Sequence, residues 1–336
     1  MLRKTNTLPD KVDLNLTREE WRLDSEPGRE VESMVDRIKT RKTSNIRQVP
    51  GSTYGGQFTL DWTERPRTVL IVKKPNDVKT ENALIQMATW LHEHQPNLNI
   101  VVEPEVAEQF HEKLPFVHVI DRNQKQEYTR TVDFAITLGG DGTILHLSSL
   151  FPKSAPPVLC FSMGTLGFLM SFHYSNFQRV LKDVIDGKVS LMLRMRLFCS
   201  LHQSDGKRIS VDGKEIGMVY FGLRWVSGSK TPVKGDWQAM NEVSLHRGRY
   251  SHLTYIDCYV DDQYLTECVI GEASRSQIEV SVDGQEIFML NKGDYLKVRM
   301  SKYPIPCVAR INADNDWATD INELLKWNQN FGRNLA

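Results

Sequence analysis

The spacing of apolar residues changes twice along the chain. Up to about residue 60, apolar residues are sparse, charges of both signs alternate, and the run from Val49 to Gly56 is rich in Gly. Such a stretch buries too little apolar surface to offset the entropy that ordering removes. Residues 1–62 are therefore predicted to be a polar, disordered extension that ends in a linker.

Between residues 64 and 188, short apolar runs alternate with amphipathic stretches. The runs are β-branched or aliphatic, too short for helices of normal length, and apolar on both faces, which predicts buried strands of a parallel sheet. The amphipathic stretches between them predict helices that cover both faces of that sheet. We therefore expect a doubly wound α/β domain with strands at 68–72, 99–102, 117–120, 132–138 and 157–161.

Residues 189–303 follow a different pattern. Side-chain character alternates from one residue to the next, and the Asp-Gly dipeptides at 212–213 and 283–284 are typical of hairpin turns. This pattern predicts a β-rich, sandwich-like domain. Residues 304–332 are expected to close the chain with a helix that begins near Asp316, and its apolar stripe predicts that it returns to pack on the α/β domain.

The composition narrows the functional classes. Lys and Arg total 42 against 42 Asp and Glu, which argues against broad binding to nucleic acid because that requires clustered positive charge. No apolar run approaches the roughly 18 residues of a membrane span, so no membrane association is expected. The first residues carry acids and no apolar signal segment, and the five Cys are scattered singly. These features predict a reducing, cytoplasmic location.

The most informative segment runs from residue 132 to 151. An apolar strand leads into Gly139-Gly140-Asp141-Gly142, and an apolar helix follows. The carboxyl ends of parallel strands are where such sheets bind ligands, and glycines at a helix N-terminus let backbone N–H groups approach a phosphate. A carboxylate there would repel phosphate unless it held Mg²⁺ or accepted the proton of an attacking hydroxyl. From spacing alone, the alternative is a tight turn whose acid complements the helix dipole.

These residues resemble a known family. The run Leu138-Gly139-Gly140-Asp141-Gly142-Thr143 is similar to the signature of NAD kinases and of their lipid-kinase relatives, and residues 156–169 resemble the run that follows it in NAD kinases. Lipid kinases usually place an acidic, Asn-containing helix after the glycines, whereas this chain has Ile144-Leu145-His146-Leu147. Asn241-Glu242-Val243 and Asp316-Trp317 also match in order. The resemblance covers about residues 66–328 and is nearest to the fungal and animal enzymes.

The resemblance implies an NAD kinase/diacylglycerol kinase-like fold whose residues 64–188 form the nucleotide-binding domain. It implies ATP-dependent transfer of the γ-phosphate to the 2′-hydroxyl of the NAD adenosine ribose, which makes NADP, with Mg²⁺ on the ATP phosphates and a homo-oligomeric assembly. Asp141 would activate the hydroxyl, and Phe168 would pack on the dinucleotide. The residues lining the phosphate site would be Gly139, Gly140, Gly142 and Thr143.

The resemblance also assigns a role to the pair Asn241-Glu242, whose amide and carboxylate groups would hold ribose hydroxyls. The residues alone do not lead to that role. A polar pair directly before the apolar Val243 reads more simply as a turn before a strand. Both interpretations remain open at the level of the sequence.

The chain departs from the family in the β-rich domain. Family members carry a Thr-Pro-Thr-Gly-Ser-Thr-Ala-Tyr run followed by further strands, but here Val269 is followed almost at once by Gln277. The domain at 189–303 is therefore expected to be truncated, either by an error in the gene model or in splicing, or by divergence into an inactive paralogue. The rival to an enzyme is accordingly a non-catalytic nucleotide-binding protein, and a lipid kinase is a weaker third hypothesis.

Charged side chains outside the glycine turn are further candidates for the phosphate site. No Gly-Lys-Ser/Thr phosphate loop is present, so another device must hold the ATP phosphates. Lys73 and Lys74, at the end of the first predicted strand, are candidates, and a solvated loop is the alternative. His146 is predicted to lie on the helix body rather than at the phosphates. The pair His92 and His94 lacks neighbouring Cys or His, so no metal site is predicted.

Overall fold

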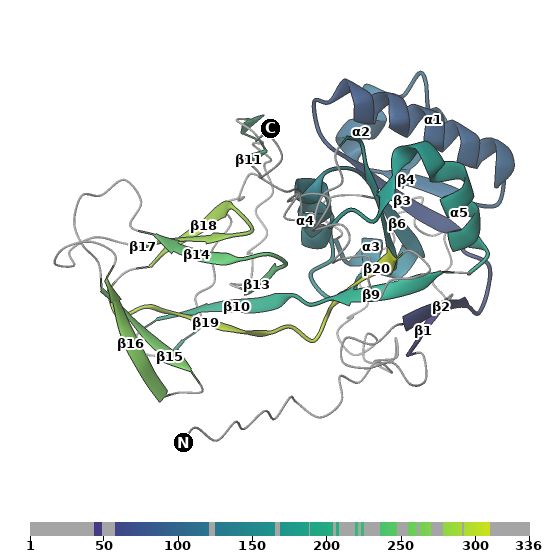
Figure 1. Ribbon diagram of the computed structural model, residues 1–336. Coiled ribbons are helices and arrows are strands. Elements are labelled where there is room, and N and C mark those ends of the chain that lie inside the picture. The colour runs from purple at the N-terminus through teal and green to yellow at the C-terminus, as the bar shows by residue number, and fades with distance from the viewer. Residues whose placement is uncertain are drawn as a thin grey trace, which may run out of the picture. The chain divides into compact units, whose positions relative to one another are not determined.

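The computed structural model divides the chain into two compact units (Figure 1). One unit holds the residues up to Arg194 and from Ile305 onward, and the other is Met195–Pro304. Each unit is described by itself. The residues that the structure describes are 44–48, 58–120, 125–164, 169–187, 189–203, 206–207, 219–220, 223–224, 236–246, 255–260, 263–269, 278–290 and 292–309.

The first unit is built on one mixed sheet. Its strands are β1 (Ser44–Gln48), β2 (Phe58–Trp62), β3 (Thr68–Lys73), β4 (Asn99–Val102), β5 (His118–Val119), β6 (Phe134–Gly139), β7 (Val158–Ser162), β8 (Phe172–His173), β9 (Ser190–Arg194) and β20 (Ile305–Ala309). Their order is β1-β2-β9-β20-β7-β6-β3-β4-β5, with β8 beside β7. The strands from β20 to β5 pair in parallel. The predicted parallel sheet is thus confirmed at its centre, and β9, β2 and β1 extend it with antiparallel pairs.

Helices cover both faces of this sheet, as predicted. They are α1 (Val78–His94), α2 (Pro104–Gln109), α3 (Lys125–Thr131), α4 (Asp141–Leu150) and α5 (Phe177–Ile185), the last preceded by the 3-10 turn η4 (Tyr174–Asn176). Leu84 of α1 and Leu181 of α5 share one core with Ile136 of β6. α4 lies on the other side of the sheet from α1 and α5 (Figure 1). There, Phe151 meets Tyr128 of α3 edge-on, with ring centroids 6.2 Å apart.

Two strands lie inside the predicted polar extension, and that prediction was wrong for them. In β2, Leu60 is 2% exposed, whereas the neighbouring Thr59 points to solvent. The indole Nε1 of Trp62 donates a hydrogen bond to the carbonyl oxygen of Val184, at 2.6 Å. Residues 58–62 alternate between apolar and polar, which is the pattern of a half-buried strand. The low apolar content of the surrounding stretch concealed it.

The boundary between the units also differs from the predicted one. β9 was expected in the β-rich domain, but it pairs with β2 and β20 in the sheet of the first unit. β20 brings the chain back to that sheet, inside the segment predicted to return. The partners of a strand are chosen by contacts distant in sequence, so its own pattern does not place it in a domain. Residues 1–43 and the helix predicted near Asp316 lie outside the described residues.

The second unit is built from antiparallel strands, as predicted. Its strands are β10 (Leu197–His202), β11 (Val219–Tyr220), β12 (Leu223–Arg224), β13 (Asp236–Ala239), β14 (Val243–His246), β15 (Tyr255–Val260), β16 (Gln263–Val269), β17 (Ile278–Val282), β18 (Gln285–Leu290) and β19 (Tyr295–Met300). They form the sheets β13-β10-β19 and β14-β17-β18 and the hairpins β11-β12 and β15-β16. Cys199 of β10, Ala239 of β13 and Val282 of β17 share one buried cluster. The two three-stranded sheets therefore pack face to face, as a sandwich-like domain requires.

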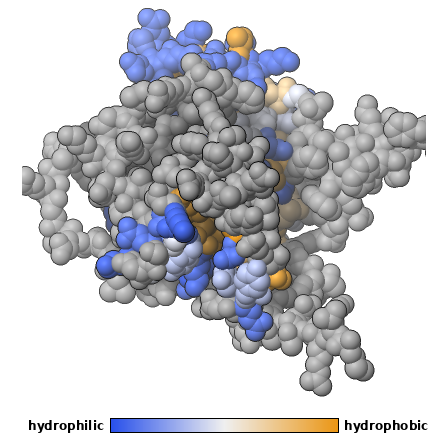
Figure 2. Space-filling model, turned by 90° about the vertical axis from the view of Figure 1, so that its left-hand side faces the viewer, coloured by the Kyte–Doolittle hydropathy of each residue, from blue (hydrophilic) through white to orange (hydrophobic). Residues whose placement is uncertain are grey.

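The surface is mainly polar where it is described. On the face drawn in Figure 2, hydrophilic side chains form the upper edge, and apolar side chains are visible lower down. The largest exposed apolar side chains of the second unit lie on β15, β16 and β19 and include Tyr259, Leu265 and Met300, which are 60%, 65% and 58% exposed. Within the described part of the chain, every helix is too short or too polar to cross a membrane.

The placement of β2 in the core generates the first prediction. Leu60→Ala should lower the free energy of unfolding by about 2–5 kcal/mol, because it removes a buried side chain and leaves a cavity. Thr59→Ala, one residue away on the solvent side of the same strand, should change it by no more than about 0.5 kcal/mol. Urea denaturation measures both. Equal and small effects would show that residues 58–62 do not belong to the core.

Candidate active site

The glycine turn lies where β6 ends and α4 begins. Gly139 has a φ of 157°, and a Cβ at this position would overlap the Oγ1 of Thr143 and come within 3.0 Å of the Lys74 Cβ. Only glycine therefore fits this turn as it is built. The Thr143 N–H donates to the Gly140 carbonyl at 2.9 Å, and among the described residues no atom beyond its chain neighbours lies within 4 Å of where a Gly140 Cβ would stand. The turn thus leaves open space beside its backbone at the edge of the sheet.

Asp141 is the first residue of α4 and is half-buried. Its Oδ1 accepts a hydrogen bond from the backbone N–H of Leu169, at 3.0 Å. This bond brings the chain after β7 back to the glycine turn, across 28 residues. Phe168, predicted to contact the dinucleotide, lies outside the described residues, directly before Leu169. The carboxylate is thereby held in a fixed place at the N-terminal end of a helix, whose dipole favours negative charge.

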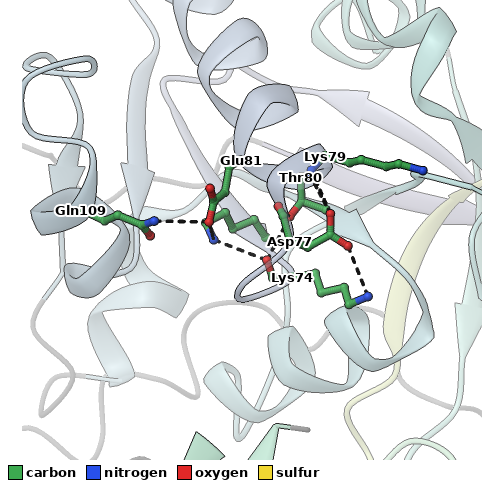
Figure 3. A network of polar contacts seen from close by, with 7 residues as sticks. Lys74, Asp77, Lys79, Thr80, Glu81 and Gln109 are labelled. Atoms are coloured by element: carbon green, nitrogen blue, oxygen red, sulfur yellow. Dashed lines mark hydrogen bonds and ion pairs between the residues drawn. The ribbon is translucent and has the colours of Figure 1, made fainter.

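Lys73 is the last residue of β3 and is 6% exposed. Its Nζ lies 3.6 Å from the Glu81 Oε1 and 5.8 Å from the centroid of the Phe110 ring. The Gln109 side chain donates to the same Glu81 oxygen at 3.2 Å, as Figure 3 shows. Lys73 thus ties β3 to α1 and α2. Lys73 was predicted either to hold the ATP phosphates or to lie in a solvated loop. Its burial and its contact with Glu81 support neither prediction.

Lys74 stands next to the glycine turn. Its backbone N–H donates to the Leu138 carbonyl at 2.9 Å, and its Cβ, like the Thr143 side chain, lies where a Gly139 side chain would be. The Lys74 Nζ lies 3.3 Å from the Asp77 Oδ2, and its side chain is 43% exposed (Figure 3). A partly exposed ammonium group therefore lies at the same edge of the sheet as Asp141.

Asp77, which the sequence analysis did not single out, is the residue that caps α1. Its Oδ1 accepts the backbone N–H groups of Lys79 at 3.0 Å and Thr80 at 3.2 Å. Partial burial acts to raise the pKa of Asp77, but the Thr80 N–H and the Lys74 ammonium group together lower it. The carboxylate is therefore ionised near neutral pH and holds Lys74 beside the turn. An Asp directly before an apolar-periodic stretch was the available signal for this cap.

His146 lies on the body of α4, which confirms its predicted position. Its Nε2 is 2.7 Å from the Oε1 of Glu103, the residue that precedes α2. This contact joins the helix that carries Asp141 to the segment after β4. His146 therefore links α4 to the residue that precedes α2.

Asn241 and Glu242 lie in the second unit, in the turn between β13 and β14, and both are exposed. This placement confirms the turn before a strand that the residues alone indicate. Their backbone N–H groups donate to the Oδ1 of Asp283, at 2.8 and 3.1 Å. The contact with ribose that the resemblance implies stays a prediction. The structure thus groups the glycine turn with Asp141 and Thr143 in one unit and places Asn241 and Glu242 in the other.

Few protein side chains at this site are placed to bind a metal ion. Within the described ranges, no group of three or more His, Cys, Asp and Glu side chains is arranged to hold a metal ion. Mg²⁺ differs from zinc in this respect, because it is commonly bound by one or two carboxylates together with substrate phosphates. A single carboxylate, Asp141, at the start of α4 fits that mode.

Comparison with known proteins agrees with this arrangement. Residues 69–189 match the ATP-NAD kinase N-terminal domain. A crystal structure of yeast NADH kinase complexed with NADH has a TM-score of 0.71 to this chain, at 27% identity, covering 90% of this chain and 98% of that one. Residues 69–189 therefore carry the ATP-NAD kinase N-terminal domain.

Two curated relatives show how far the similarity extends along the chain. It is 28% identical over 335 residues to the probable NAD kinase 1 of Oryza sativa subsp. japonica, over 81% of this chain and 58% of that one. It is 26% identical over 333 residues to the mitochondrial NADH kinase pos5 of Schizosaccharomyces pombe, over 82% of this chain and 78% of that one. The chain thus spans little more than half of the rice relative.

The cytoplasmic location predicted from composition was wrong on this comparison. Two fungal relatives, from Schizosaccharomyces pombe and Saccharomyces cerevisiae, are named as mitochondrial NADH kinases. Unpaired cysteines indicate a reducing environment, and more than one compartment of a cell is reducing. Composition therefore could not identify the compartment.

Proposed function

We propose that the chain is an ATP-dependent NAD kinase that transfers the γ-phosphate of ATP to the 2′-hydroxyl of the adenosine ribose of NAD. The observation that carries the proposal is the position of Asp141, a half-buried carboxylate held by the Leu169 N–H in a glycine turn at the carboxyl edge of the sheet. Ligands bind at this edge in open α/β sheets. Relatives named as NAD and NADH kinases support the choice of substrate.

In the proposed reaction, Asp141 accepts the proton of the 2′-hydroxyl as its oxygen forms a bond to the γ-phosphorus. The bond between that phosphorus and the oxygen that bridges it to the β-phosphate breaks, and ADP leaves with the electron pair. Phosphoryl transfer asks the protein mainly for positioning and charge neutralisation. One fixed carboxylate in a turn of glycines suits that demand.

The phosphates of ATP are proposed to lie against the glycine turn and Lys74. Backbone N–H groups at the start of α4 supply a positive dipole end, and the missing side chain at Gly140 leaves room for close approach. Lys74 adds a full positive charge at the same edge, held by Asp77 at 3.3 Å. Lys73 is already committed to Glu81 and Phe110, so we assign the electrostatic role to Lys74.

Mg²⁺ is proposed to act with the ATP phosphates, and Asp141 is the protein carboxylate placed to assist in holding it. When bound, the ion neutralises charge on the phosphate oxygens.

The second unit is proposed to bind the ribose through Asn241 and Glu242, and Phe168 is proposed to pack on the dinucleotide. We also propose a homo-oligomer, supported by the exposed apolar side chains of β15, β16 and β19.

The rival function is a nucleotide-binding protein without catalysis. The observation that favours it is the short link between Val269 and Gln277, where family members carry a longer run with contacts to the dinucleotide. Residues 270–277 lie outside the described residues. Formation of NADP separates the two functions, because a binding protein would retain nucleotide affinity without turnover.

The role of Asp141 generates a prediction on turnover. In a form with the family segment restored, Asp141→Asn should leave the Kd for NAD within about twofold and lower kcat by about 10²–10⁴, because an amide cannot accept the hydroxyl proton. The assay is NADP formation with ATP, Mg²⁺ and NAD. Normal turnover by the Asn variant would exclude Asp141 as the proton acceptor.

The role of Lys74 generates a prediction on ATP. Lys74→Ala should raise the KM for ATP about tenfold, equivalent to about 1.4 kcal/mol, with little change in the KM for NAD. Lys79→Ala is the matched control, since Lys79 is an exposed lysine in the first turn of α1. An equal effect of both substitutions would mean that only general surface charge attracts ATP.

The short link in the β-rich domain generates a prediction on the chain as printed. Its NADP formation should be lower by more than about a hundredfold than that of a version with the family segment restored, because misplacement by about 1 Å alone costs that much. Its thermal unfolding should also occur at a lower temperature, since unpaired strand edges replace sheet. Comparing both proteins in one assay decides the matter. Equal turnover would show that residues 270–277 replace the missing contacts.

A further inference from the structure

Asp283 stands at the turn of the β17–β18 hairpin. Its φ is 50°, and that of Gly284 is 77°, so both central residues are left-handed. Asp-Gly is a preferred pair for such a two-residue turn, because Asp tolerates the left-handed region and Gly adopts it freely. Backbone conformation alone would account for Asp-Gly at this turn. Here the Asp side chain also has partners outside its own hairpin.

The Asp283 carboxylate gathers three consecutive backbone N–H groups from the turn between β13 and β14. Its Oδ1 accepts from Asn241 at 2.8 Å, from Glu242 at 3.1 Å and from Met240 at 3.1 Å, and its Oδ2 accepts from Met240 at 2.9 Å. The Asp283 N–H in turn donates to the Glu242 carbonyl at 3.0 Å. Hydrogen bonds to a charged acceptor are stronger than neutral ones. This turn is therefore held at each of its residues.

The strand ladder holds the neighbouring residues independently. Val243 of β14 lies opposite Val282 of β17, and the pairing continues from there along both strands. Removal of the Asp283 carboxylate would thus leave β14 and β17 paired and would free only the turn before them. Because the Asn241 and Glu242 side chains are exposed, their direction depends on the conformation of that backbone.

A buried positive charge lies near the same carboxylate. Arg196 is 1% exposed, its Nε donates to the Tyr303 carbonyl at 2.7 Å, and its own carbonyl accepts from the Ser301 N–H at 2.8 Å. Burial lowers the pKa of Arg196 to about 10, and the negative charge of Asp283 opposes that shift. Burial, with Asp283 nearby, also raises the pKa of Cys199 to about 12. Arg196 is therefore the cation whose charge complements Asp283.

We propose that Asp283 is a positioning residue that fixes the backbone of Asn241 and Glu242 so that their side chains meet the ribose hydroxyls of the dinucleotide. The proposal rests on the proposed function for its ligand, but the hold on the turn stands on the contacts given above. A turn fixed before binding spares the complex the entropy of ordering it. Loss of the carboxylate should therefore weaken dinucleotide binding without removing a contact to the ligand.

The test uses the chain as printed and compares Asp283→Gly with Asp283→Asn. Glycine keeps the left-handed backbone but removes the carboxylate, whereas Asn keeps one acceptor oxygen and tolerates the same φ. The expected result is amide hydrogen exchange at Met240, Asn241 and Glu242 that is at least about tenfold faster in the Gly variant, with Val280 and Val282 unchanged. The Asn variant should be intermediate. Asp257→Asn, an exposed residue on β15, is the control.

Binding of NADH, followed by its own fluorescence, gives the second measurement. The Gly variant should bind NADH about tenfold more weakly, and Asn241→Ala should remove the effect of the Gly substitution, because both act through one contact. Equal NADH affinity in the wild type and the Gly variant, or unchanged exchange at the three amides, would overturn the proposal. Absence of NADH binding and of NADP formation by both the wild type and the segment-restored form would overturn the proposed function instead. If the Gly variant unfolds, the exchange rates of the Asn variant decide.

Discussion

The parallel pairing of β3 with β6 is the constraint on which the proposed active site depends. Lys73 pairs with Leu138, so both strands end at the same level, and the Lys74 N–H then reaches the Leu138 carbonyl at 2.9 Å. This register places a lysine side chain against the glycine that opens the turn to α4. A slip of one residue would turn each side chain to the opposite face and separate the charge from the turn. The chemistry at this edge is therefore a consequence of backbone pairing in a buried sheet.

Carboxylates that accept backbone N–H groups recur in both units of the chain. Asp77 accepts two amides at the start of α1 and holds Lys74. Asp141 accepts the Leu169 amide, and Asp283 accepts three amides from the turn that bears Asn241 and Glu242. In each case a carboxylate accepts backbone N–H groups at a helix start or in a connecting segment: the first turn of α1, the chain after β7, or the turn between β13 and β14. Such segments carry the residues that we expect to meet the nucleotides.

The family relation and the geometry support one another in different ways. The match over residues 69–189 identifies the N-terminal domain, and the similarity to yeast NADH kinase supports the fold. The contacts of Lys73 and Lys74 add a distinction that resemblance did not provide, since only the second is placed to present its charge at the turn. The cytoplasmic prediction shows the converse case, in which relatives corrected an inference that composition could not support.

The sequence by itself determined the elements whose signal is local. The apolar runs of β3, β6 and β7 predicted a buried parallel sheet, the glycine turn predicted the site at its edge, and Asp283-Gly284 predicted a hairpin. Tertiary structure decided what depends on partners far along the chain. It placed β2 and β9 in the first sheet, buried Lys73 while exposing Lys74, and turned Asp283 toward residues 240–242. The physical reason is that strand pattern and turn chemistry act over a few residues, whereas pairing, burial and side-chain direction are set by neighbours that only the folded chain brings together.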